Sequence, residues 1–139
     1  MNREIHINSE IKNISVVEKL VEEVCDSIFN GKELYGNILV AVLEAVTNCI
    51  IHGNKRISDK QVTIKIYASV SEIVFIISDQ GEGFDINSIP DPTRYENLEN
   101  PHGRGIFLMK KLSDYFEYDE TLRAFILKFY PEKKVEIIQ

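Results

Sequence analysis

The feature that most constrains the fold is an apolar run that ends abruptly in a polar, glycine-rich stretch. Residues 73–77 are all apolar β-formers, and Ser78-Asp79-Gln80-Gly81-Glu82-Gly83 follows them directly. A strand that is apolar on both faces belongs in the interior of a sheet. Asp79 therefore sits at the end of a buried strand, where a carboxylate is tolerated only if it is hydrogen-bonded.

The spacing of apolar residues along the rest of the chain predicts an α+β domain. Helical spacing covers about 11–29 and 33–51, and a third helix is expected over about 103–112. Strands are expected over 3–7, 61–68, 72–78, 115–119 and 123–130, with a tight turn near 69–71 that makes an antiparallel hairpin. Asn8 or Ser9 offers an N-cap for the first helix. We expect one domain over residues 1–139, with a mixed, mostly antiparallel sheet and helices on one face in two layers.

Composition narrows the class of partner. The chain has 139 residues, a net charge of −6 and no long basic run, which argues against a nucleic-acid-binding protein. No apolar run approaches 18 residues and the first residues lack the apolar core of a signal peptide, so we expect no membrane association. The two cysteines, Cys25 and Cys49, lie on apolar helical faces and are expected to be small buried hydrophobes in the reducing cytoplasm.

Glu44 and Asn48 form the first candidate site. They lie four residues apart on the second predicted helix and therefore share a face. A carboxylate and a carboxamide at this spacing can present oxygens to a hard cation and to a hydroxyl, and Mg²⁺ often takes one or two protein oxygens together with phosphates and water. The alternative is a solvent-exposed polar stripe. The nearly apolar surroundings from residue 38 to 51 argue against that alternative.

Asp79 and the two glycines that follow it form the second candidate site. The exocyclic amine of adenine is a donor that would satisfy a buried carboxylate at this position. Gly81 and Gly83 permit positive φ and let a flat ring or a phosphate approach the backbone closely. The alternative is a simple turn, because Asp before Gly is a common turn sequence.

A second glycine pair forms the third candidate site. Gly103-Arg104-Gly105 stands directly before the third predicted helix, where backbone N–H groups and the helix dipole favour an anion and Arg104 adds a bidentate donor. The chain lacks both the P-loop pattern and a Gly-x-Gly-x-x-Gly after its first strand. His52 and His102 do not complete a zinc spacing with Cys49. The remaining glycines at 31, 36 and 53 are interpreted as helix punctuation.

These segments, in this order, resemble a known family. Residues 44–54, Glu-Ala-Val-Thr-Asn-Cys-Ile-Ile-His-Gly-Asn, look like the N box of the GHKL (Bergerat-fold) ATPases in the form typical of bacterial anti-sigma-factor serine kinases. Residues 79–84 resemble the first glycine box of that family, and residues 103–109 resemble the second. The boxes have the family's order and spacing, and the resemblance covers essentially the whole chain.

The resemblance implies a role for each site residue. Asn48 would bind a Mg²⁺ ion that bridges the phosphates of ATP, and Glu44 would be the general base for attack on the γ-phosphate. Asp79 would read the adenine amino group, with Gly83 beside the base, and Gly81 would also belong to the nucleotide-binding residues. Gly103, Arg104 and Gly105 would hold the phosphates, and the loop from about 89 to 102 would be the ATP lid. The protein substrate would be a serine on a STAS-type antagonist, the same protein could sequester a sigma factor, and a homodimer is expected.

Two departures from the family pattern leave the choice of partner open. A Gly-Thr pair commonly opens the last strand, whereas residues 119–124 here read Asp-Glu-Thr-Leu-Arg-Ala, with Thr121 as the nearest hydroxyl. Residues 97–102 also differ from the expected kinase lids.

Two classes of function remain. The first class is a protein-serine kinase, which is favoured because nucleotide binding alone needs no base such as Glu44. The second is a nucleotide-gated module that sequesters a sigma factor or another partner with little phosphotransfer. A third interpretation, the catalytic half of a histidine kinase, is disfavoured. The first strand is expected to begin at residue 3, which leaves no room before it for a dimerisation helix pair with a phosphoacceptor histidine.

Overall fold

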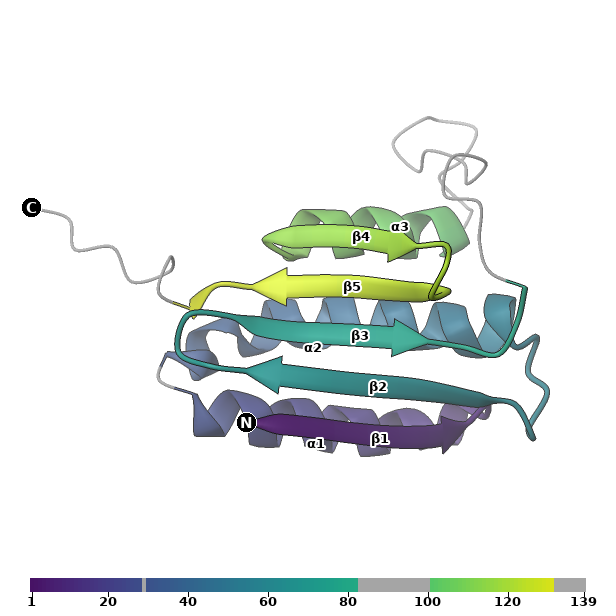
Figure 1. Cartoon of the computed structure of the whole chain (residues 1–139), viewed down its shortest axis with the longest axis horizontal. Coiled ribbons are helices and arrows are strands. Elements are labelled where there is room, and N and C mark those ends of the chain that lie inside the picture. The colour runs from purple at the N-terminus through teal and green to yellow at the C-terminus, as the bar shows by residue number, and fades with distance from the viewer. Residues whose placement is uncertain (29, 83–100, 132–139) are drawn as a thin grey trace, which may run out of the picture.

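The computed structural model describes residues 1–28, 30–82 and 101–131 (Figure 1). The helices are α1 (Ile14–Ser27), α2 (Gly31–Asn48) and α3 (Pro101–Leu112), with a short 3-10 turn, η1 (Ile11–Asn13), before α1 and a π-helical turn, η2 (Cys49–Gly53), after α2. The strands are β1 (Asn2–Asn8), β2 (Gln61–Ala68), β3 (Ile73–Ser78), β4 (Tyr115–Asp119) and β5 (Ala124–Phe129). The predicted order of helices and strands is therefore confirmed.

The five strands form one sheet in the order β1-β2-β3-β5-β4, and each pair of neighbours is antiparallel. The strand that is apolar on both faces, β3, is the central one, as its composition predicts. All three helices cover the same face of the sheet (Figure 1). The expected two-layer α+β architecture is confirmed.

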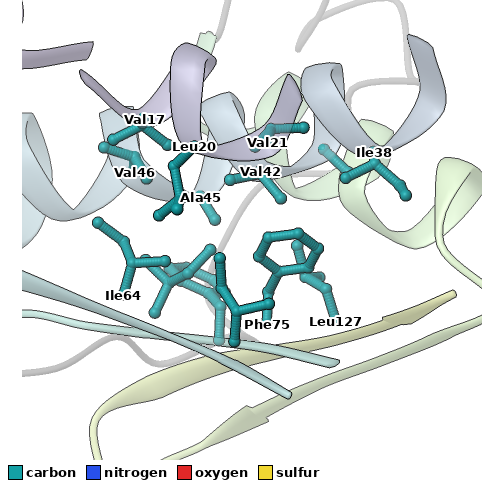
Figure 2. Packing of buried hydrophobic residues seen from close by; sticks show 14 of the residues in the cluster. Val17, Leu20, Val21, Ile38, Val42, Ala45, Val46, Ile64, Phe75 and Leu127 are labelled. Atoms are coloured by element: carbon teal, nitrogen blue, oxygen red, sulfur yellow. The ribbon is translucent and has the colours of Figure 1, made fainter. Parts of the chain in front are cut away.

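The core lies between the sheet and the helices (Figure 2). The alternation along β3 buries Ile73, Phe75 and Ile77, because every second side chain of a strand points to the same face. Helix α2 contributes side chains that pack on them, and the apolar face of α1 adds further side chains to the same core. The fully buried residues of these two helices are Val17, Val21, Val24, Ile38, Ala41, Val42, Ala45 and Val46.

The expected N-cap of the first helix is wrong. Helix α1 follows Asn13, and neither that residue nor Glu10 before η1 makes a side-chain capping bond. Ser9 is buried instead, and its hydroxyl donates a 2.6 Å hydrogen bond to the carbonyl of Lys60. The side chain that could cap the helix thus ties the end of β1 to the start of β2.

One helical segment contradicts the expectation that no stretch approaches the length of a membrane span. Gly31–Gly53, which joins α2 to η2, is 23 residues long with a mean hydropathy of 1.7, enough to cross a membrane by length and composition alone. Half of its apolar window is buried inside the protein. Because α2 is the helix that supplies much of the core, its hydropathy is accounted for by packing against the sheet.

Candidate functional site

Helix α2 carries the first pair of site residues at its C-terminal end. Glu44 is half-buried, and Asn48, one turn later, is 3% exposed. The Asn48 Nδ2 atom donates a 2.7 Å hydrogen bond to the backbone carbonyl of Glu44, which fixes the orientation of the amide. Its Oδ1 atom is buried and has no hydrogen-bond partner among the described residues. The exposed-stripe interpretation of this pair is therefore wrong for Asn48.

Helix α3 crosses α2 where these two side chains lie. A Cβ atom at Gly105 would stand 2.8 Å from both Asn48 Nδ2 and Glu44 Oε2, closer than real side chains approach. Only a glycine allows this contact without displacing the pair. The neighbouring Arg104 is exposed, and its positive charge lowers the pKa of Glu44, but burial has the larger effect and raises that pKa overall.

The start of α3 differs from the prediction. The helix begins at Pro101, two residues before the predicted start, so Gly103, Arg104 and Gly105 lie within its first turns rather than ahead of it. Proline is favoured at the first position of a helix because its missing N–H would have no partner there. The helix dipole still favours an anion near these residues.

Asp79 follows the central strand and is 6% exposed. Its Oδ1 atom accepts a 2.7 Å hydrogen bond from the backbone N–H of Gly81, whereas its Oδ2 atom is buried without a hydrogen-bond partner among the described residues. Burial raises the pKa of Asp79, and the Gly81 amide, the Cys49 thiol and the charges of Arg123 and Lys60 partly oppose that rise. The carboxylate thus presents one unsatisfied acceptor.

The interpretation of three glycines as helix punctuation holds for Gly31 and Gly53, which lie at helix ends, and is wrong for Gly36, which lies inside α2. Gly53 has a further role in the site. The π-helical turn η2 brings Gly53 against the Asp79 carboxylate, and a Cβ atom at Gly53 would stand only 2.0 Å from Asp79 Oδ2. A Cβ atom at Gly81 would in turn collide with the carbonyl of Gly53. Single π-helical turns inside α-helices are frequent at functional sites. Gly53 is therefore a part of this site that pattern reasoning assigned to the helix alone.

Asn54 is a second site residue whose role the sequence pattern did not reveal. It is fully buried, and its Oδ1 atom accepts a 2.8 Å hydrogen bond from the backbone N–H of Gln80. Its Nδ2 atom donates to the Ser9 hydroxyl at 2.8 Å and to the Gln61 carbonyl at 3.0 Å. Asn54 thus links the ends of β1 and β2 to the turn that carries Asp79. A polar residue beside a predicted helix end was the only signal of it.

The two halves of the site are joined through consecutive residues. Asn48 carries one orphaned oxygen, and the next residue, Cys49, lies beside the Asp79 carboxylate that carries the other. Cys25 and Cys49 are both buried free thiols, as predicted. Burial and the neighbouring Asp79 raise the pKa of Cys49 well above its ordinary value of 9.0, so this thiol stays protonated.

Three predicted features lie elsewhere or outside the described residues. Gly83 and residues 89–100 of the predicted lid fall in the range 83–100, which the structure does not describe. Thr121 is exposed in the turn before β5, and Ala124 is the residue that pairs with Ser78 at the end of β3. Thr121 therefore does not occupy the position opposite the strand end from which Asp79 follows.

The residues present fit a nucleotide and a hard cation. The unsatisfied Oδ2 of Asp79 requires a donor such as an exocyclic amine, and the unsatisfied Oδ1 of Asn48 can serve as one protein oxygen for Mg²⁺, whose other ligands are commonly phosphates and water. No group of three or more His, Cys, Asp or Glu side chains in the described part of the chain could hold a metal ion by itself.

A cavity of about 260 Å³ between α1 and α2 lies away from these residues. It is lined by Glu22, Cys25, Asp26, Lys32 and Tyr35. Burial, with a smaller contribution from Asp26, raises the pKa of Cys25 to about 11. None of the lining side chains has an orphaned buried polar atom in the described part of the chain. The site formed by α2, η2 and the end of β3 is therefore the better candidate for ligand binding.

Comparison with known proteins identifies the family of this chain. Residues 7–128 match the family model of the histidine kinase-like ATPase domain. The anti-sigma F factor of Thermoanaerobacter sp. (strain X514) is 32% identical over 120 residues, which cover 85% of this chain and 83% of that protein. The serine-protein kinase RsbW of Listeria innocua serovar 6a is 30% identical over 112 residues, 75% of this chain and 71% of that protein. The RsbW of Oceanobacillus iheyensis is 24% identical over 142 residues, 96% of this chain and 90% of that protein.

The matched region includes α2, η2, β3 and α3, the elements that build the site. It also includes residues 44–54, 79–84 and 103–109, and the relatives are an anti-sigma factor and serine-protein kinases. The chain belongs to the histidine kinase-like (GHKL) ATPase domain family.

Proposed function

We propose that this protein is an ATP-dependent protein-serine kinase and anti-sigma factor that phosphorylates a STAS-type antagonist in a partner-switching circuit. The observation that carries the proposal is the pair of buried, orphaned oxygens, Asn48 Oδ1 and Asp79 Oδ2, in two neighbouring segments of the site. An unsatisfied buried polar group costs about 1–3 kcal/mol. Two such groups in one site are explained if a bound nucleotide and its cation supply the missing partners.

In this proposal, each site residue contacts a different part of the substrate. Asp79 accepts from the adenine amine, and Gly81 and Gly83 lie beside the base. Gly103, Arg104 and Gly105 hold the phosphates, where Arg104 supplies positive charge. Asn48 supplies an oxygen to Mg²⁺, which when bound neutralises charge on the phosphates.

Glu44 is the proposed general base. Its half-buried carboxylate takes the proton from the substrate serine as the serine oxygen bonds to the γ-phosphorus. The bond between that phosphorus and the β,γ-bridging oxygen breaks, and ADP leaves. Burial raises the pKa of Glu44, which makes the carboxylate a better proton acceptor, while Arg104 keeps that rise from going further.

The partners follow from the same assignment. The anti-sigma F factor of Thermoanaerobacter is named for its partner, and a sigma factor is the corresponding proposal for this chain. We further propose a homodimer in the cytoplasm that contacts neither nucleic acid nor membrane directly.

The experiment is phosphotransfer from γ-labelled ATP with Mg²⁺ to candidate STAS-type proteins, using wild type and Glu44→Gln. The substitution keeps the size of the side chain and removes the base. We expect Glu44→Gln to bind ATP with wild-type affinity while phosphotransfer falls by about 10²–10⁴, the usual range for loss of a general base. Asn48→Ala should instead weaken Mg²⁺-nucleotide binding itself, because it removes the proposed metal ligand.

The second candidate is a nucleotide-gated module that sequesters a sigma factor without significant phosphotransfer. The similarity to an anti-sigma factor is the observation that favours it. This candidate wins if wild type and Glu44→Gln transfer phosphate equally poorly, yet both bind a sigma factor in a nucleotide-dependent way. A serine-specific transfer that Glu44→Gln abolishes would exclude it.

A further inference from the structure

Arg123 lies in the turn between β4 and β5, directly before a residue that faces the end of the central strand. Ala124, the first residue of β5, pairs with Ser78, the last residue of β3. From this position the Arg123 Nη1 atom donates a hydrogen bond to the backbone carbonyl of Gly81. Arg123 therefore binds the turn in which the Gly81 N–H donates a hydrogen bond to the Asp79 carboxylate.

The backbone of Arg123 is in the left-handed region, with a φ of 53°. A non-glycine residue rarely adopts this conformation without a reason. The same turn is closed by a 2.9 Å hydrogen bond from the Leu122 N–H to Asp119 Oδ1. The tight turn thus ends with Arg123, whose guanidinium reaches Gly81 beyond the end of the neighbouring strand β3.

The charge of Arg123 acts on Asp79. The groups that face this carboxylate are the Gly81 amide, the Cys49 thiol, Arg123 and Lys60, and all four favour its ionised form against the effect of burial. Arg123 differs from Lys60 because it also makes a direct hydrogen bond to the turn. It can therefore influence both the position and the charge of Asp79.

We propose that Arg123 is a positioning residue of the adenine subsite, whose guanidinium holds the Asp79–Gly81 turn in the geometry that presents Asp79 Oδ2 to the base. The inference rests on the proposed nucleotide site. It adds a residue outside the N box and both glycine boxes, and it gives the β4–β5 turn a part in nucleotide binding. The hydrogen bond maintains the shape of the turn, and the positive charge lowers the pKa of Asp79 against the larger effect of burial.

These two contributions can be separated by substitution. Arg123→Ala removes both, Arg123→Lys keeps the charge, and Arg123→Gln keeps a donor without the charge. Arg56→Ala is the matched control, because Arg56 is also an exposed arginine with a positive φ, 59°, and its charge is not among those that act on Asp79. Any effect of placing alanine in the left-handed region is common to both alanine variants.

The measurement is the dissociation constant of Mg-ADP from pH 5 to pH 8 for these variants. Titration of the ADP phosphates affects every variant alike, so differences between variants report on the protein. We expect Arg123→Ala to bind about 10-fold more weakly at pH 8, the scale of one hydrogen bond to a charged group. Its affinity should also begin to fall at a higher pH than in wild type, because Asp79 is protonated more readily. Arg123→Lys should restore the pH at which affinity falls, and Arg123→Gln should restore part of the affinity at pH 8.

Three results would overturn the inference. Arg123→Ala could keep the wild-type affinity and pH profile, Arg56→Ala could lose as much affinity, or both the Lys and Gln variants could behave like the alanine variant. Failure of wild type to bind Mg-ADP at any pH would instead refute the proposed nucleotide site itself. The two failures are therefore distinguishable in one set of titrations.

Discussion

At the scale of single residues, Asp79 combines a functional role with a cost to folding. Burial raises its pKa from the ordinary value of 3.8, and one of its oxygens has no partner in the described part of the chain. A carboxyl group whose pKa rises on folding binds protons more tightly in the folded state. Its contribution to stability is therefore greatest at low pH and falls as the pH rises from the ordinary value through the raised one.

The substitution Asp79→Asn should consequently stabilise the ligand-free protein at neutral pH. The amide keeps an oxygen for the Gly81 N–H and removes the buried charge. We expect a gain of about 1 kcal/mol at pH 7.5, or about 3 °C in Tm. The gain should shrink as the pH is lowered, because the raised pKa of Asp79 lets the wild-type carboxylate take up a proton and lose its buried charge. Thermal melts of both proteins across this pH range make the comparison, and a variant that is less stable than wild type by the same amount at every pH would contradict the assignment.

The residues of the site differ in how far they could be predicted. Glu44, Asn48 and Asp79 stand in local patterns, a helical spacing and a strand end, whose chemistry is visible within a few residues. Gly53 and Arg123 contact the Asp79–Gly81 turn from segments distant in sequence, so no local pattern marks them. Gly53 therefore looked like an ordinary helix terminator.

At the scale of elements, the site depends on how closely α3 lies on α2. Gly105 is the point of contact, and a side chain there would press on Glu44 and Asn48. Both of the atoms it would meet are ends of side chains, so the helices need not separate to accommodate it. The damage should therefore fall on the orientation of the pair rather than on the fold.

Gly105→Ala should keep its folding stability and lose function. Alanine favours a helix over glycine by about 1 kcal/mol, which offsets the crowding. We expect a Tm within a few degrees of wild type but about 10-fold weaker Mg-ATP binding. Gly36→Ala is the control, because Gly36 is an exposed glycine of α2 where a Cβ atom would meet no other atom within 4 Å. The control should gain stability and keep wild-type binding, and equal binding by both variants would show that the contact at Gly105 does not matter.

The elements themselves were largely predictable, whereas their ends were not. Periodicity located the helices and strands because their buried faces repeat. The N-cap prediction failed because the Ser9 hydroxyl bonds to Lys60 across the β1–β2 pair, and α3 began early because Pro101 is suited to a first helical position. The ends of helices and strands are thus determined by tertiary contacts and by one or two residues at the boundary.

At the scale of the whole molecule, the sequence predicts which elements form each layer better than it predicts where elements distant in sequence contact each other. The central position of β3 follows from its two apolar faces, and the single helical layer follows from the amphipathic helices. The approach of η2 to the end of β3 could not be foreseen, because it depends on a π-helical turn and on Asn54 linking three segments. These contacts between η2, Asn54 and the end of β3 join the two halves of the site.

The most direct test of the central claim is calorimetric titration of wild type with Mg-ATP and, separately, with Mg-GTP. The Asp79 carboxylate accepts from the amine of adenine but would meet a carbonyl oxygen in guanine, and such a buried mismatch costs about 1–3 kcal/mol. We predict that ATP binds roughly ten- to a hundredfold more tightly than GTP. Equal affinities for the two nucleotides would contradict the account.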